Sequence, residues 1–122
     1  MRYDTILITT GLLCLLIGEG IGIWMGIGQD FTYAPAHAHL NLVGWVTLCL
    51  YGLAHRAYPA LAKSRLAMIQ AVLAIAAALV LPAGIAYAIT SQNPIVAIVG
   101  SLGVLLGTAM FAVMFVRHAK KA

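Results

Sequence analysis

The feature that most constrains this chain is a series of four apolar stretches, at about residues 5–27, 37–58, 66–89 and 95–116. A helix that crosses a bilayer needs about 20 mainly apolar residues, and each stretch meets that length. The segments between them are rich in Gly, Pro, Asn and Ser, which are typical of turns. Backbone groups in lipid must be bonded within their own segment unless a barrel closes, and the alternation of a barrel wall is absent. The pattern therefore predicts an all-α integral membrane protein.

Composition supports the same class. Of the 122 residues 63% are hydrophobic and only 8% are charged, whereas a soluble domain carries about 25% charged residues. Seven Lys and Arg residues and three Asp and Glu residues cannot cover the surface of a soluble globule of this size. Disorder is excluded as well, because it requires low hydrophobicity and high charge. We expect residues 1–122 to form a single transmembrane domain.

Lysine and arginine positions predict the orientation. All of them lie at or beyond the ends of the stretches that meet on one side of the membrane: Arg2, Arg56, Lys63, Arg65, Arg117, Lys120 and Lys121. Because cytoplasmic segments carry an excess of these residues, we expect an up-down four-helix bundle with both termini cytoplasmic. The expected location is a bacterial-type inner (cytoplasmic) membrane. The formal net charge of +4 then reflects topology and contact with the lipid bilayer, and nucleic acid is not an expected partner.

Small residues recur in two of the stretches. Gly18, Gly22 and Gly26 are spaced by four residues, and Gly103 and Gly107 repeat this spacing. Such spacing lets membrane helices approach closely. We interpret both sets as helix-packing positions.

Polar residues in the second stretch follow one helical face. At about 100° per residue, one direction is shared by six side chains, which are His37, Asn41, Gly44, Leu48, Tyr51 and His55. His39 points nearly the opposite way, so one regular helix cannot bring His37 and His39 to a single metal ion. Because lipid cannot satisfy polar groups, this stripe is expected to face the bundle interior or a partner chain.

Depth places the remaining polar groups in two clusters. The outer cluster would contain Glu19, His37 and Asn41, with His39 and Asp30 as further candidates above them. The inner cluster would contain Gln70, Tyr51 and His55, with His118 near the cytoplasmic surface. Glu19 is the one acidic residue inside a stretch, and it is either a functional carboxyl or a protonated group that bonds a neighbouring helix. His55 is interpreted first as an interfacial residue and second as a ligand.

Two segments carry a resemblance to a known family. Residues 34–46 read Ala-Pro-Ala-His-Ala-His-Leu-Asn-Leu-Val-Gly-Trp-Val, and residues 52–59 read Gly-Leu-Ala-His-Arg-Ala-Tyr-Pro. These segments resemble haem–copper oxidase subunit I-like proteins, including nitric oxide reductase relatives and small four-helix proteins. The resemblance implies that His37 and His39 are ligands of haem or metal on opposite faces of their helix. Haem b is the cofactor it suggests, with copper or another transition metal as the alternative.

Three functional hypotheses follow. In the first, the protein binds haem or a metal near the outer membrane face for electron transfer or support of a respiratory complex, with Glu19 and Asn41 orienting the ligand histidines. A homo-oligomer or a larger membrane complex would supply missing ligands, since four helices and four histidines do not suffice for a complete oxidase. In the second, the bundle is a non-catalytic structural or assembly subunit. In the third, Glu19 titrates in proton or solute transport.

Overall fold

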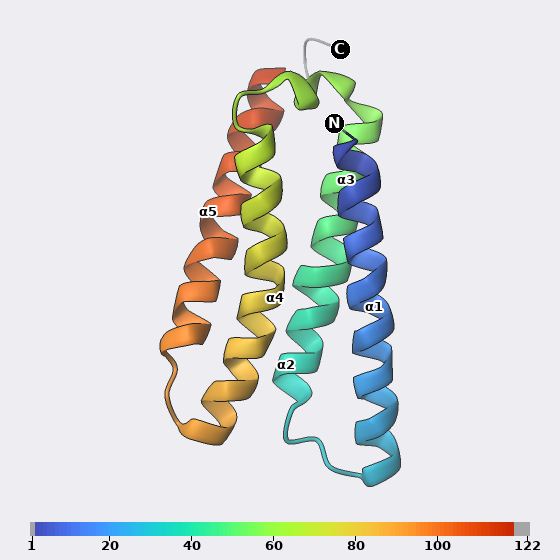
Figure 1. The fold of residues 1–122 in the computed structure, drawn as a ribbon, viewed down its shortest axis with the longest axis vertical. Helices are drawn as coiled ribbons and strands as arrows, with labels where there is room; N and C mark the ends of the chain where they lie inside the picture. Colours follow the sequence, from blue (N-terminus) through green and yellow to red (C-terminus); the bar gives the residue numbers. More distant parts are fainter. Residues whose placement is uncertain (1, 119–122) are drawn as a thin grey trace.

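The computed structural model describes residues 2–118, which form four helical rods lying side by side (Figure 1). The first rod is α1 (Tyr3–Gly28), and the third and fourth are α4 (Ala67–Ser91) and α5 (Ile95–His118). The second rod is composite: α2 (Ala34–His39), the π-helix η1 (Leu40–Thr47) and α3 (Leu48–Ala57). A short 3-10 helix, η2 (Pro59–Lys63), leads from α3 toward α4. The predicted all-helical class is confirmed.

Three helices are long and apolar enough to cross a membrane, and they are α1, α4 and α5. The second stretch was expected to be one regular helix over residues 37–58. It differs because a π-helix interrupts it, although the rod continues through the interruption (Figure 1). The described helices are thus compatible with a lipid bilayer, and their outer faces are apolar, as at Ile27, which is 82% exposed.

Turn residues end the helices where the sequence predicts. Gln29 follows α1 and Gln92 follows α4, and both adopt the left-handed conformation, with φ of 51° and 61°. Their backbone N–H groups donate to carbonyls of the preceding turn, at Met25 and Ala88. Such left-handed residues stop a helix and satisfy its last carbonyls.

The π-helix changes which residues share a face. In η1 the Thr47 hydroxyl donates to the Leu42 carbonyl five residues earlier, at 2.9 Å. Because a π turn holds one residue more than an α turn, every position after it is rotated relative to a regular helix. The face that His37 and Gly44 present to α1 continues after η1 at Gly52, where an added Cβ would lie 2.6 Å from Ile8. Tyr51 lies inside the bundle, as the stripe predicts, and its hydroxyl bonds Thr108 of α5 rather than a residue of α1.

The helices pack mainly with their neighbours in the chain. The α1 helix packs along η1 and α3, α4 packs along α5, and α2 and η1 also contact α4. The buried core lies in the half of the bundle where α1 begins, and its centre includes Leu7, Leu48 and Met114.

Glycines bring α4 and α5 close together. A Cβ added to Gly100 would lie 2.7 Å from the Leu81 Cα, and one added to Gly84 would lie 2.6 Å from the Ala97 nitrogen. The sequence predicted this role for Gly103 and Gly107, and an added Cβ at Gly103 would indeed lie 3.1 Å from the Ala77 Cβ. A Cβ at Gly107 would meet its neighbours at an ordinary 3.9 Å, so the closest approach lies nearer the start of α5.

Candidate functional site

An apolar groove opens between α1, α2 and α4, in the half of the bundle opposite the buried core. Its volume is about 390 Å³. It is lined by Ile17, Ile21, Trp24, Tyr33, Ala36, His37, Leu40, Leu79, Pro82, Ala83 and Ala86. His37 supplies the only imidazole in this lining, so the groove combines an apolar wall with a single nitrogen donor.

Glycines of α1 make room for the polar side chains of the second rod. The Cε1 atom of His37 lies 3.0 Å from the position that a Cβ of Gly22 would occupy. A Cβ at Gly18 would overlap the Asn41 amide. Gly18 and Gly22 thus act as packing positions, as predicted, but they accept side chains rather than a second backbone. Gly26, the third member of that set, has nothing within 4 Å of an added Cβ.

Two buried polar atoms beside the groove have no hydrogen-bond partner among the described residues, and they are the His37 Nδ1 and the Asn41 Oδ1. The Asn41 amide nitrogen lies 3.5 Å from the His37 Nε2, which is at the long limit for a hydrogen bond. A buried polar atom without a partner costs about 1–3 kcal/mol. A bound ligand that used the imidazole would remove part of this cost.

His39 has a different environment. Its Nδ1 lies 2.7 Å from the Pro35 carbonyl, and a carbonyl can only accept, so Nδ1 carries the proton of this bond. In the neutral ring this leaves a lone pair on Nε2. A backbone carbonyl that fixes the tautomer in this way is the usual support of a metal-binding histidine. His39 does not line the groove, so the two histidines are directed to different surroundings.

Glu19 does not join the outer cluster. It is exposed on α1, one residue after Gly18, and about 100° around the helix from the side that receives Asn41. Asp30 is also separate, because the Thr32 hydroxyl and backbone N–H donate to its carboxylate and hold its pKa below the ordinary value. Of the predicted outer cluster, the structure brings together only His37 and Asn41.

The predicted inner cluster is divided among different partners. The Tyr51 hydroxyl bonds the Thr108 hydroxyl at 3.1 Å, and the Gln70 amide donates to the Gly107 carbonyl at 3.1 Å. His55 is buried, and its ring centroid lies 5.1 Å from that of Tyr3 and 6.3 Å from that of Phe111. Both nitrogens of His55 lack a partner among the described residues.

Sequence reasoning missed the aromatic neighbours of His55. Tyr3 belongs to α1 and Phe111 to α5, so their approach to α3 depends on the tertiary packing. Within residues 2–118, no group of three or more His, Cys, Asp or Glu side chains is placed to hold a metal ion. Any metal at His37 or His39 would therefore need donors beyond the acidic, thiol and imidazole groups that this chain places nearby.

No protein-family model matches the chain, and neither do the curated proteins or the solved structures compared with it. The likeness to oxidase subunit I-like proteins thus stands on residues 34–46 and 52–59 alone.

Proposed function

We propose that this chain is an integral membrane protein that binds haem b in the groove between α1, α2 and α4, with His37 as an axial ligand. Support comes from the groove itself, which joins an apolar wall to a single imidazole whose Nδ1 is buried and without a partner. Haem needs an apolar site for its macrocycle and a strong axial donor. The buried Nδ1 of His37, which has no partner among the described residues, is the observation that carries this proposal.

Bound haem would supply a one-electron redox centre, which suits electron transfer or the support of a respiratory complex. The chain's own residues have three tasks. His37 would be the ligand, the Asn41 amide lies against its ring, and Gly18 and Gly22 leave space for both side chains. Since His37 is the only histidine that lines the groove, a second haem ligand would have to come from a partner chain in a homo-oligomer.

His39 suits a separate centre. Its Nδ1 bond to the Pro35 carbonyl presents Nε2 as a donor away from the groove. We propose that a copper ion, another transition metal or a second haem binds there, together with donors from a neighbouring subunit. Asymmetric use of the two histidines agrees with what the oxidase resemblance implies. A complete oxidase activity is not proposed for the chain on its own.

We propose that the protein crosses a bacterial-type cytoplasmic membrane four times, with both termini in the cytoplasm. Arg2 and segments 56–65 and 117–121 account for all seven Lys and Arg residues, whereas loops 29–33 and 92–94 contain no Lys or Arg. The α2 end of the groove then faces the outer leaflet.

One observation favours a second function, that of a structural or assembly subunit. The α5 helix packs mainly against α4, and its other faces expose large apolar side chains such as Leu105, which is 67% exposed. Such a face can pack against a larger membrane complex. The transport hypothesis gains no such support, because Glu19 is exposed on α1 rather than inside the bundle.

The test is the visible absorption spectrum of the purified protein, compared with those of three variants. We expect a Soret band that is lost in His37→Ala and is weakened or shifted in Gly22→Ala, whose new methyl group presses on the imidazole. Gly26→Ala is the matched control, since nothing lies within 4 Å of its added Cβ.

Far-UV circular dichroism checks that each variant stays helical. A protein without haem after expression with ample haem, or a Soret band that is unchanged in His37→Ala, would contradict the proposal. A folded, haem-free protein that copurifies with a respiratory complex would instead favour the assembly function.

A further inference from the structure

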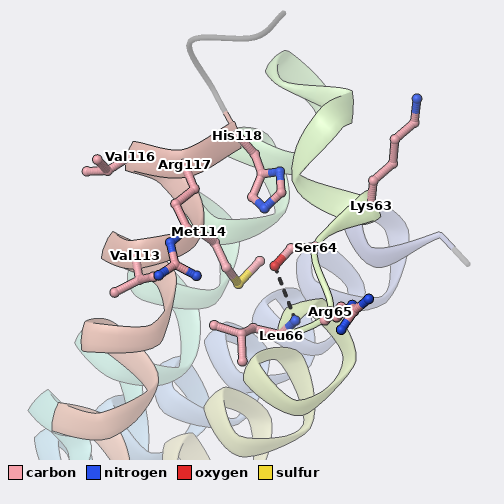
Figure 2. Close-up of a pocket in the computed structure, with 9 residues that line it drawn as sticks. All are labelled: Lys63, Ser64, Arg65, Leu66, Val113, Met114, Val116, Arg117 and His118. Carbon is pink, nitrogen blue, oxygen red and sulfur yellow. Dashed lines mark hydrogen bonds between the residues drawn. The ribbon is translucent and has the colours of Figure 1, made fainter.

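A second cavity lies at the other end of the bundle, between the segment that precedes α4 and the last turns of α5 (Figure 2). Its volume is about 560 Å³. Two parts of the chain far apart in sequence form its wall, namely residues 63–66 and residues 113–118. The haem proposal makes no use of this cavity.

Basic side chains surround the cavity. Its lining includes Lys63, Arg65, Arg117 and His118 but no Asp or Glu. Both ion pairs among the described residues use Asp4, and they involve Arg2 and Arg56. Within residues 2–118, the basic side chains of this cavity therefore have no carboxylate to neutralise them, which leaves a site that attracts an anion.

Ser64 adds a hydrogen-bond donor among these charges. Its hydroxyl oxygen accepts the backbone N–H of Leu66 at 3.1 Å, so the hydroxyl proton remains available to donate (Figure 2). The His118 ring lies on the facing side and points toward Ser64 (Figure 2). The His118 imidazole and the Ser64 hydroxyl can both donate to the oxygens of a phosphate group, and the guanidinium groups of Arg65 and Arg117 add positive charge on either side of the cavity (Figure 2).

The rest of the lining is apolar. Leu66, Val113, Met114 and Val116 supply it, and Val116 is 63% exposed on the outer side of α5. A soluble phosphate would use only the basic part of such a cavity. A lipid would use both parts, because its phosphate meets the charges while its acyl chains lie along the apolar side chains.

We propose that this cavity binds the phosphate group of an anionic lipid from the cytoplasmic leaflet. The proposal depends on the membrane orientation given above and not on the haem site. A neighbouring cavity of about 290 Å³ provides the contrast, since it is lined by Arg2 and Arg56 together with Asp4, which pairs with both arginines. This neighbouring cavity thus also holds two arginines at the same end of the molecule, but both are paired with a carboxylate.

The experiment measures lipid binding to the full-length protein in detergent micelles by native mass spectrometry. The probes are phosphatidylglycerol, phosphatidylcholine and inorganic phosphate. We expect phosphatidylglycerol to bind best and its affinity to fall about tenfold or more in Arg65→Gln/Arg117→Gln. Arg2→Gln/Arg56→Gln removes the same two charges from the same end of the molecule and should change the affinity much less.

Three results would overturn the assignment. One is equal loss in both double variants, which would indicate surface charge rather than a site. Another is equal binding of phosphatidylcholine and phosphatidylglycerol. A third is inorganic phosphate that binds as tightly as the lipid, which would make this a site for soluble phosphate. Absorbance and circular dichroism of the same samples separate these outcomes from failure of the haem proposal or of folding.

Discussion

Glycines and polar side chains form complementary pairs between α1 and the second rod. Gly18 faces Asn41, Gly22 faces His37, and Gly44 faces Cys14, where an added Cβ would lie 2.8 Å from the Cys14 Cβ. In each pair, a glycine on one helix leaves the space that a side chain on the other helix fills. These pairs hold His37 against α1 at the edge of the groove.

Substitution of Gly18 tests this complementarity. Gly18→Ala adds a methyl group that overlaps the Asn41 amide, and we expect it to lower the free energy of unfolding by about 1–3 kcal/mol. Gly20→Ala is the control, because nothing lies within 4 Å of its added Cβ and Ala favours a helix. Reversible unfolding in mixed micelles, followed by circular dichroism, measures the difference.

A double-mutant cycle separates this overlap from other causes. In an Asn41→Ala background the overlapping atoms are gone, so Gly18→Ala should cost much less than in the parent chain. An equal cost in both backgrounds would show that Asn41 is not the group that Gly18 accommodates.

At the scale of elements, η1 is the feature that sets the geometry of the second rod. Its extra residue rotates α3 relative to α2, so that His37 faces α1 while Tyr51 bonds α5. π-helical turns are rare in proteins and occur frequently at functional sites. Here η1 directly follows the two histidines.

A single deletion tests the role of η1. Removing Val46 from η1 should leave a regular helix with the flanking faces unchanged, and it brings the Thr47 hydroxyl to the usual four-residue distance from the Leu42 carbonyl. Removing Leu53 from α3, which is also apolar and exposed, should instead rotate one flank of the rod by about 100°. We expect the thermal midpoint to fall much further for the Leu53 deletion.

Circular dichroism during heating measures both deletions. An equal fall in thermal midpoint for both deletions would show that η1 does not accommodate an extra residue relative to a regular helix. The Val46 deletion also retains His37 beside Gly22, so its Soret band should persist if the haem proposal is correct.

At the scale of the whole molecule, four rods stand side by side in chain order (Figure 1). They present apolar side chains outward and gather their basic residues at one end. The loops at the other end, 29–33 and 92–94, carry no Lys or Arg. The two ends of the bundle therefore differ in charge, because one end carries the basic residues and the other carries none.

Cysteine labelling in whole cells tests the orientation that this asymmetry implies. Asn93→Cys, in the loop between α4 and α5, should react with a membrane-impermeant maleimide added outside the cells. Ala62→Cys, in η2 at the basic end, should react only after the membrane is permeabilised. The parent chain is the control, since Cys14 is buried and Cys49 is half-buried within the bundle. The opposite pattern would reverse the proposed topology.

The sequence by itself determined the helical class, the approximate ends of the rods and the residues that end them, because apolar length and turn residues act locally. It also predicted that His37 and His39 face different surroundings and that Asn41 accompanies His37. It predicted that Tyr51 faces the bundle interior, where Tyr51 is buried and bonds Thr108, but it did not predict the π-helix that precedes this residue.

Only the tertiary structure decided which neighbours those residues meet. Glu19 is exposed on α1, His55 lies between Tyr3 and Phe111, and Gly84 and Gly100 set the approach of α4 to α5. Each of these outcomes joins residues from different helices. Their contacts depend on how the helices rotate and slide against one another, which hydrophobic periodicity along one segment does not encode.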